Sequence, residues 1–112
     1  MKRPWAFICA GESATAKNLR NYCREVYLLG YLPVCPKLQD GQYLLLDDPV
    51  ERSEYAAIVR DKLLRCQMLV VCSRNQDATT NAQIGLAQKY SRIVTTLDGL
   101  KKAVAEGDDL VS

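Results

Sequence analysis

One segment, residues 68–87, constrains the fold more than any other part of the sequence. It reads MLVVCSRNQDATTNAQIGLA: a short apolar run (Met68 to Cys72), a stretch of polar and small residues, and a helical pattern expected to begin near Asn81. A buried strand, a polar loop and a helix start form the unit on which α/β proteins hold nucleotides and sugars. We therefore expect the loop from Ser73 to Thr80 to face a ligand at the carboxyl end of the strand.

Strand-like and helical patterns alternate along the rest of the chain. Pro33 lies within the second apolar run and predicts an edge strand, because proline cannot donate to a sheet ladder. Four strand–helix units in 112 residues predict a single α/β domain, residues 1–112, of the doubly wound flavodoxin or Rossmann type, with a four-stranded parallel sheet of order 2-1-3-4. The expected strands are residues 5–10, 32–35, 68–72 and 92–96, and the expected helices are residues 14–29, 49–65, 81–90 and 100–105.

Helix ends and one long connection carry further signals. Asp48, Pro49 and Glu51 have the residue types of an N-cap, a first helical position and the third residue of a capping box. Asp98 is expected to cap the last helix. The connection Lys37 to Asp47 follows the predicted edge strand, so we expect it to fold over the ligand site as a lid.

In the order 2-1-3-4 the switch point lies between the first and third strands, where ligands bind outside the carboxyl ends. The loop Ala10 to Ser13 and the loop Ser73 to Thr80 therefore meet at the predicted site. Glu12 and Asp77 are its carboxylates, and paired carboxylates can divide into nucleophile and general acid. The more common roles of such residues are solvated loop acids or, for Asp77, the cap of a turn. Arg74 offers a planar fork for phosphate or carboxylate, although a surface position is the more common one for an arginine.

Composition excludes several classes of function. The chain has no histidine, so catalytic triads, Cys-His dyads and nearly all transition-metal sites are excluded, and we expect no metal and no cofactor. Its net charge of +2 includes no basic stripe, so we expect no nucleic-acid binding. The apolar runs are too short for a membrane span or a signal peptide, which predicts a cytoplasmic protein without a membrane partner. The five cysteines form no CxxC pair and are expected to be reduced core thiols.

Several motifs, taken in order, resemble the nucleoside 2-deoxyribosyltransferase-like superfamily, especially its small bacterial and phage-borne members. The resemblance covers residues 5 to about 96. It rests on the opening strand FICA (7–10), the helix NLRNYCR (18–24), GYLPV (30–34) with Pro36, the helix start DDPVER (47–52), LRC (64–66) and the helix NAQIGLA (81–87). Members of this family cleave the N-glycosidic bond of deoxynucleosides or nucleotides, with a glutamate in the first turn of the third helix as nucleophile.

The resemblance places that glutamate at Gln83. A neutral amide is a far poorer nucleophile than a carboxylate and stabilises an oxocarbenium charge less well. Three other positions depart from the family pattern: Phe7 replaces a tyrosine, Lys37 a histidine and Gln67 an aspartate. The resemblance therefore implies a protein that binds a nucleotide, nucleoside or ribosylated signal with the glycosidic chemistry disabled. One form of this function is a phage-type sponge for a nucleotide signal of host immunity.

Two alternatives stay open at this stage. The first is an active N-glycosidase or deoxyribosyltransferase in which Glu12 or Asp77 supplies the carboxylate. The second is a structural or interaction module, which predicts no pocket with convergent polar groups. The family resemblance also implies a homo-oligomer, for which residues 43–46 and the helix at 49–65 are the candidate surface. The expected ligand-binding residues are Phe7, Ala10, Gly11, Glu12, Lys37, Arg74, Asp77, Thr80 and Gln83.

Overall fold

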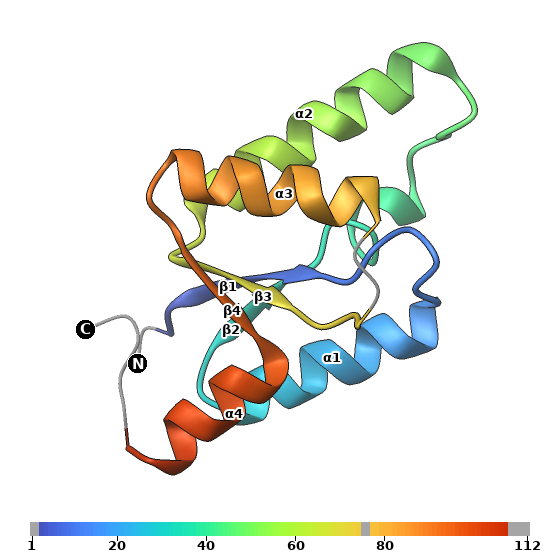
Figure 1. Ribbon diagram of the computed structural model, residues 1–112. Helices are drawn as coiled ribbons and strands as arrows, with labels where there is room; N and C mark the ends of the chain where they lie inside the picture. Colours follow the sequence, from blue (N-terminus) through green and yellow to red (C-terminus); the bar gives the residue numbers. More distant parts are fainter. Residues whose placement is uncertain (1–2, 75–76, 108–112) are drawn as a thin grey trace.

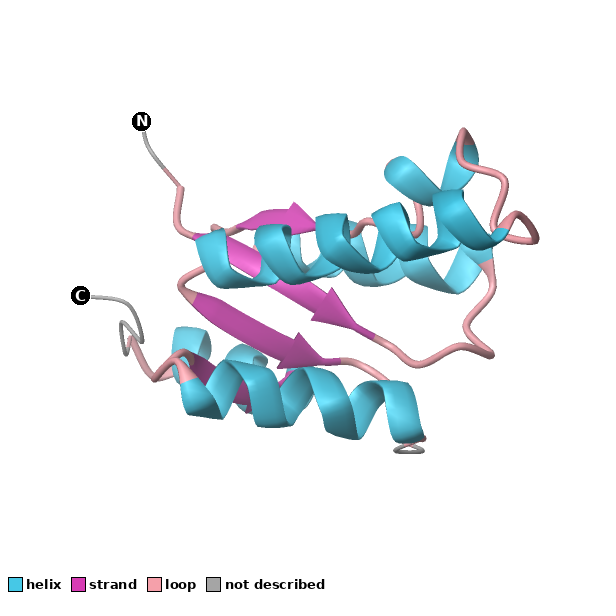
Figure 2. Cartoon of the chain, turned by 90° about the horizontal axis from the view of Figure 1, so that it is seen from above, coloured by secondary structure: helices cyan, strands magenta, loops and turns pink. Residues whose placement is uncertain are grey.

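The computed structural model describes residues 3–74 and 77–107 of the chain. Its four strands form one parallel sheet of order β2-β1-β3-β4 (Figures 1 and 2). This confirms the predicted fold class, and Pro33 indeed lies in an edge strand. The elements are β1 (Trp5–Cys9), α1 (Ala16–Leu28), β2 (Leu32–Val34), the 3-10 helix η1 (Asp40–Gln42), α2 (Pro49–Arg65), β3 (Met68–Val71), α3 (Ala78–Lys89), β4 (Ile93–Thr96) and α4 (Leu97–Ala105).

Two helices cover each face of the sheet (Figure 1). Side chains alternate along each strand, so β1 directs Ala6 and Ile8 into the core beneath α1 and α4. The same strand directs Phe7 and Cys9 into the core beneath α2 and α3. β3 is buried along its whole length, as expected for a central parallel strand. No helix among the described residues is long and apolar enough to cross a membrane.

Two helices begin earlier than their sequence pattern predicts. α3 begins at Ala78 rather than near Asn81, because the Asp77 carboxylate accepts the Thr80 N–H at 2.8 Å and caps the helix three residues sooner. α4 begins at Leu97, because the Thr96 hydroxyl caps it by accepting a backbone N–H. Asp98 is therefore not the cap of this helix but lies in its first turn, where a negative charge favours the helix dipole.

The start of α2 confirms Asp48 as N-cap and Pro49 at the first position. The predicted capping box is only half formed. Glu51 donates its N–H to Asp48, but its carboxylate accepts the Leu45 N–H at 3.1 Å instead of reaching back to the N-cap. This second bond holds the preceding connection against the first turn of the helix.

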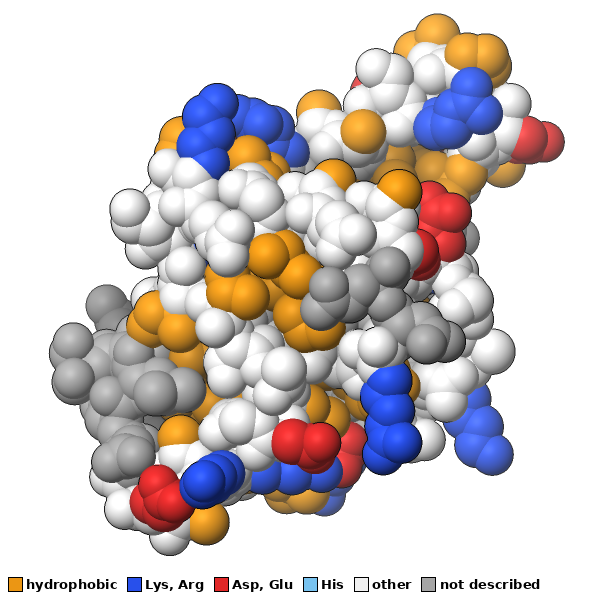
Figure 3. All heavy atoms as spheres, viewed as in Figure 1, with side chains coloured by type: hydrophobic (Ala, Val, Ile, Leu, Met, Phe, Trp, Pro, Cys, Tyr) orange, Lys and Arg blue, Asp and Glu red, His pale blue; other side chains and the backbone are white. Residues whose placement is uncertain are grey.

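The amino-terminal end of α2 and the connection before it project beyond the sheet (Figure 1). Hydrophobic side chains gather on this projection (Figure 3). We name Tyr43, Leu45, Leu46 and Val50 the apolar corner; Tyr43 and Val50 are each 66% exposed. Exposed apolar side chains that cluster in this way mark surfaces that contact something other than water.

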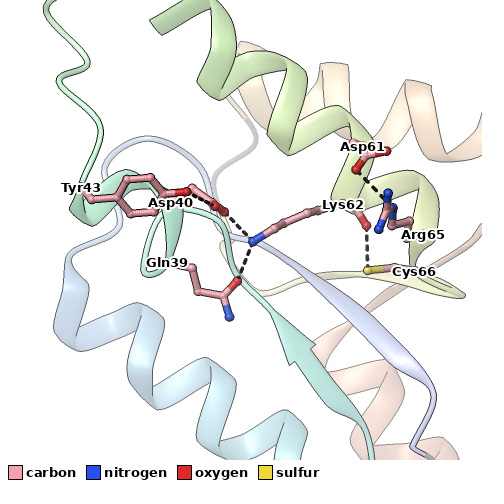
Figure 4. Close-up of polar contacts among 7 residues, drawn as sticks. All are labelled: Gln39, Asp40, Tyr43, Asp61, Lys62, Arg65 and Cys66. Carbon is pink, nitrogen blue, oxygen red and sulfur yellow. Dashed lines mark hydrogen bonds and ion pairs between the residues drawn. The ribbon is translucent and has the colours of Figure 1, made fainter. Parts of the chain in front are cut away.

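The connection is tied to α2 at its base by a partly buried ion pair (Figure 4). Lys62 Nζ donates to Asp40 Oδ2 at 2.6 Å, and the Tyr43 hydroxyl donates to the other carboxylate oxygen at 2.9 Å. Burial opposes ionisation of Asp40, but these two donors outweigh it and hold the pKa of the carboxyl below its ordinary value. The expected lid is therefore an anchored segment, and within residues 38–47 only Leu46 lines the ligand pocket described next.

Candidate functional site

A cavity of about 480 Å³ lies at the carboxyl ends of β1 and β2, between α2 and α3. Pockets for small molecules commonly measure about 300–1,000 Å³ and combine apolar walls with a few polar groups. The apolar lining comes from Phe7, Ile8, Ala10, Leu19, Pro36, Leu46, Tyr55, Ala56 and Val59, and the polar lining and its surroundings from Gly11, Glu12, Cys35, Lys37, Arg52, Thr79 and Gln83.

The loop after β1 is fixed by Asp77. Its carboxylate accepts the Glu12 N–H at 2.9 Å while capping α3 through Thr80. Hydrogen bonds from the Thr80 and Glu12 N–H groups lower the pKa of Asp77. Gly11 has a φ of +77°, and a Cβ there would lie 2.8 Å from Asp77 Oδ2. Glycine is therefore required at this position, and the Asp77 carboxylate joins the loop to the start of α3.

Glu12 is the one carboxylate that lines the cavity among the described residues. Its Oε1 accepts a hydrogen bond from the Thr79 hydroxyl at 2.7 Å. Lys37 Nζ donates to the carbonyl oxygens of Glu12 and Ala14, each at 2.9 Å. The loop is thus fixed from both sides, by α3 and by the segment after β2, and Lys37 brings a positive charge to the mouth of the cavity.

Gln83 is the sixth residue of α3, in the second turn of the helix rather than in the first as expected. The difference follows from the earlier cap at Asp77. The residue nevertheless lines the cavity together with Gly11 and Phe7. Phe7 is almost fully buried, and it contributes an apolar ring without a hydroxyl.

Sequence reasoning missed the contribution of α2. Arg52, Tyr55, Ala56 and Val59 line the cavity from this helix. Their spacing of three, four and seven residues is that of one helical face, and this was the signal available. The same face reads as core packing in the sequence, because Tyr55 and Val59 are apolar. Burial raises the pKa of Tyr55, and the nearby Cys35 and Asp40 raise it further.

Six of the nine expected ligand residues line the cavity: Phe7, Ala10, Gly11, Glu12, Lys37 and Gln83. Three others do not. Arg74 is exposed and is not among the lining residues, Asp77 is the helix cap, and Thr80 is fully buried in the first turn of α3. Residues 75 and 76 of the predicted site loop lie outside the described part of the chain.

Residues 3–74 and 77–107 contain no group of three histidine, cysteine, aspartate or glutamate side chains placed to hold a metal ion. The cavity instead offers two cationic side chains, Lys37 and Arg52, against the single carboxylate of Glu12. This balance suits an anionic ligand.

Comparison with models of known protein families finds no match, and comparison with curated protein sequences finds none either. The resemblance to nucleoside 2-deoxyribosyltransferases accordingly stays a prediction from the motifs. The arguments about function below rest on the geometry of the cavity and on the chemistry of its residues.

Proposed function

We propose that the cavity binds a nucleotide-like or nucleoside-like ligand and does not cleave its glycosidic bond. The observation that carries the proposal is the position of Gln83. It lines the pocket where the family resemblance implies a nucleophilic glutamate. An amide there can hydrogen-bond to a sugar hydroxyl through both its oxygen and its NH₂ group, but it is a far poorer nucleophile than a carboxylate.

The two carboxylates of the alternative enzyme hypothesis are already engaged. Asp77 accepts hydrogen bonds from the N–H groups of two segments and is not among the residues that line the cavity. Glu12 lines the cavity, but it accepts the Thr79 hydroxyl. A double-displacement glycosidase needs two carboxyl groups about 5 Å apart on either side of the scissile bond. One lining carboxylate favours binding over this chemistry.

The shape and charge of the cavity favour a nucleotide over a purely apolar ligand. Tyr55 offers aromatic surface for a base, while Lys37 and Arg52 offer charge for a phosphate. An ammonium carries three N–H donors; Lys37 uses two on loop carbonyls in the described structure, which leaves one for a ligand oxygen. A pocket with convergent polar groups also favours a ligand-binding protein over an interaction module that has no small ligand. Sequestration of a nucleotide signal is one form that this function takes.

Thermal denaturation in the presence of nucleosides, nucleotides, cyclic dinucleotides and ADP-ribose derivatives tests the proposal. A ligand at a hundredfold excess over its Kd stabilises the fold by about 2.7 kcal/mol, which raises the Tm by several degrees for a domain of this size. Arg52→Ala should weaken the binding of a phosphorylated ligand, and so its stabilising effect, but leave the binding of the matching nucleoside unchanged. Arg65→Ala, an exposed arginine at the far end of the same helix, is the control. No stabilisation by any member of these classes would contradict the proposal.

A further inference from the structure

Three of the five cysteines lie close together on one side of the sheet. Cys35 and Cys72 follow directly after β2 and β3, so parallel strands bring both to the carboxyl edge. Cys23 lies on α1, which covers this face, and all three belong to one core cluster. Cys9 and Cys66 belong to the core on the opposite face.

Cys35 combines burial with access to the ligand cavity. Cys35 is 4% exposed in total, cavity included, and it lines the cavity beside Lys37. The turn after β2 folds back over it, with the Leu38 and Gln39 N–H groups bonded to its carbonyl oxygen. A small oxidant that enters the cavity therefore meets Cys35 in its wall, with only a small part of the residue facing solvent.

The surroundings of Cys35 favour its thiolate. Hydrogen bonding from the Cys23 thiol lowers the pKa of Cys35 to about 7 despite its burial, with further help from the Leu38 and Lys37 N–H groups and the Lys37 charge. The same contact raises the pKa of Cys23, which keeps its proton. Burial raises the pKa of Cys66 to about 12. Reactive cysteines occupy electropositive and accessible sites of this kind, whereas buried structural thiols stay inert.

We propose that Cys35 is a peroxide-reactive thiol in the wall of the cavity, and that Cys23 resolves its oxidised form into a reversible Cys23–Cys35 disulfide. Cys23 on α1 and Cys35 at the end of β2 lie close enough for their thiols to interact, and both belong to the same core cluster. A disulfide needs its sulfur atoms about 2 Å apart and its Cβ atoms about 4 Å apart, so adjacent thiols reach it by side-chain rotation. The inference does not depend on the identity of the ligand.

The oxidation proceeds in two balanced steps with a hydroperoxide as oxidant. The Cys35 thiolate attacks one oxygen of hydrogen peroxide, the O–O bond breaks, and the leaving hydroxide takes a proton to become water. This leaves Cys35 as a sulfenic acid. The Cys23 sulfur then attacks the Cys35 sulfur, the S–O bond breaks, and the departing hydroxide takes the Cys23 proton as a second water. Two thiols and one peroxide thus give one disulfide and two waters.

The disulfide would change the ligand site as well as the core. It ties α1 to the turn that carries Lys37, and it moves one sulfur of the cavity wall toward the helix. Bound ligand that covers Cys35 should in turn slow its oxidation. In a reducing compartment such bonds are transient and regulatory rather than structural.

The test treats the reduced full-length chain with one equivalent of hydrogen peroxide, alkylates the remaining thiols and maps the peptides by mass spectrometry. We expect a single Cys23–Cys35 linkage that dithiothreitol reverses, with Cys9, Cys66 and Cys72 alkylated. Cys23→Ser should accumulate a Cys35 sulfenic acid that dimedone traps. Cys66→Ser, a thiol of the opposite core, is the matched control and should form the same linkage as the wild type.

A second measurement uses the wild type alone, so it does not depend on the folding of a variant. Iodoacetamide labelling of Cys35 should begin at a lower pH than labelling of Cys66, because the pKa of Cys35 is lowered and the pKa of Cys66 is raised. Labelling of Cys35 no faster than that of Cys66, or a linkage that joins any other pair of cysteines, would overturn the proposal.

Discussion

At the scale of single residues, Gly11 decides the shape of the loop that carries Glu12. Gly11→Ala places a Cβ in the left-handed region, at a cost of about 1–2 kcal/mol, and pushes it against Asp77 Oδ2. We expect a loss of unfolding free energy at least this large and a weaker ligand site, because Asp77 holds both the loop and the start of α3. Urea denaturation measures the change.

Gly85→Ala is the matched control for this substitution. Gly85 lies in the interior of α3, and a Cβ built there meets nothing within 4 Å. Alanine is a better helix former than glycine by roughly 0.8–1 kcal/mol, so this variant should be as stable as the wild type or more so. Equal losses from both substitutions would contradict the role given to Gly11.

The residue at position 83 also decides whether the cavity can only bind a ligand or can cleave it. Gln83→Glu returns a carboxylate to the cavity, and we expect a trace of base release from deoxynucleosides where the wild type gives none. The gain should be small, because Phe7 and Lys37 do not orient the new carboxylate as the family pattern does. A misplacement of about 1 Å costs on the order of a hundredfold in rate. Chromatography of the released base is the measurement, and robust turnover by the wild type, abolished in Glu12→Gln, would support the enzyme alternative instead.

At the scale of elements, the ion pair between Asp40 and Lys62 holds the segment that contains η1 against α2. The pKa of folded Asp40 lies below its ordinary value, so the ionised carboxylate stabilises the fold above about pH 4, and this contribution is lost as the pH falls through the folded pKa. Lys62→Met should therefore lower the unfolding free energy at pH 7 by on the order of 1–3 kcal/mol. The difference from the wild type should shrink toward pH 3, as urea denaturation at a series of pH values would show.

Lys17→Met is the control for this prediction, since Lys17 is an exposed lysine on α1. Its unfolding free energy should match that of the wild type at every pH. A Lys62→Met deficit that stays constant down to pH 3 would mean that the lysine acts through packing of its alkyl chain and not through the charge of Asp40.

Element identities and sheet order could be predicted from the sequence, because buried parallel strands are short apolar runs and proline marks an edge. Helix starts could not be predicted as well. The expected start near Asn81 was wrong because Asp77 caps α3, and the expected cap at Asp98 was wrong because Thr96 caps α4. A cap depends on whether a side-chain oxygen reaches an N–H group three residues on, and composition does not contain that geometry.

The candidate site, like the helix starts, could be predicted from the sequence only in part. The loop after β1 follows from strand order and lines the cavity. The expected loop Ser73 to Thr80 contributes only Thr79 among its described residues, because the cavity lies at the ends of β1 and β2 rather than between β1 and β3. The wall formed by α2 does not follow from strand order, because the sequence does not show how far this helix leans over the sheet edge. Arg52 and Tyr55 therefore entered the site only from the structure, as did Cys35 at the end of β2.

At the scale of the whole molecule, the apolar corner predicts self-association, in agreement with the oligomer expected from the resemblance. Leu45 is 62% exposed there beside Tyr43 and Val50. Leu46 belongs to both the corner and the cavity lining, so a second copy would also cover the cavity mouth. Light scattering at tens of micromolar should report a dimer or larger species for the wild type. Leu45→Glu should lower the measured molar mass toward that of the monomer. A monomeric wild type would contradict the prediction.

A matched control for the corner lies on the other side of the molecule. Leu28, the last residue of α1, is 64% exposed and is not among the residues that line the cavity. Leu28→Glu should leave the oligomeric state unchanged. Dissociation by Leu28→Glu and not by Leu45→Glu would place the contact surface elsewhere.

The central claim is that the cavity holds a nucleotide without breaking its glycosidic bond. Saturation-transfer NMR with a 2′-deoxynucleoside 5′-monophosphate measures both parts in one sample. We expect transfer from the protein to the base and anomeric protons, weakened in Arg52→Ala, while the anomeric signal keeps its intensity over hours. Absence of transfer would contradict binding. Loss of the anomeric signal with the appearance of free base would contradict the absence of cleavage.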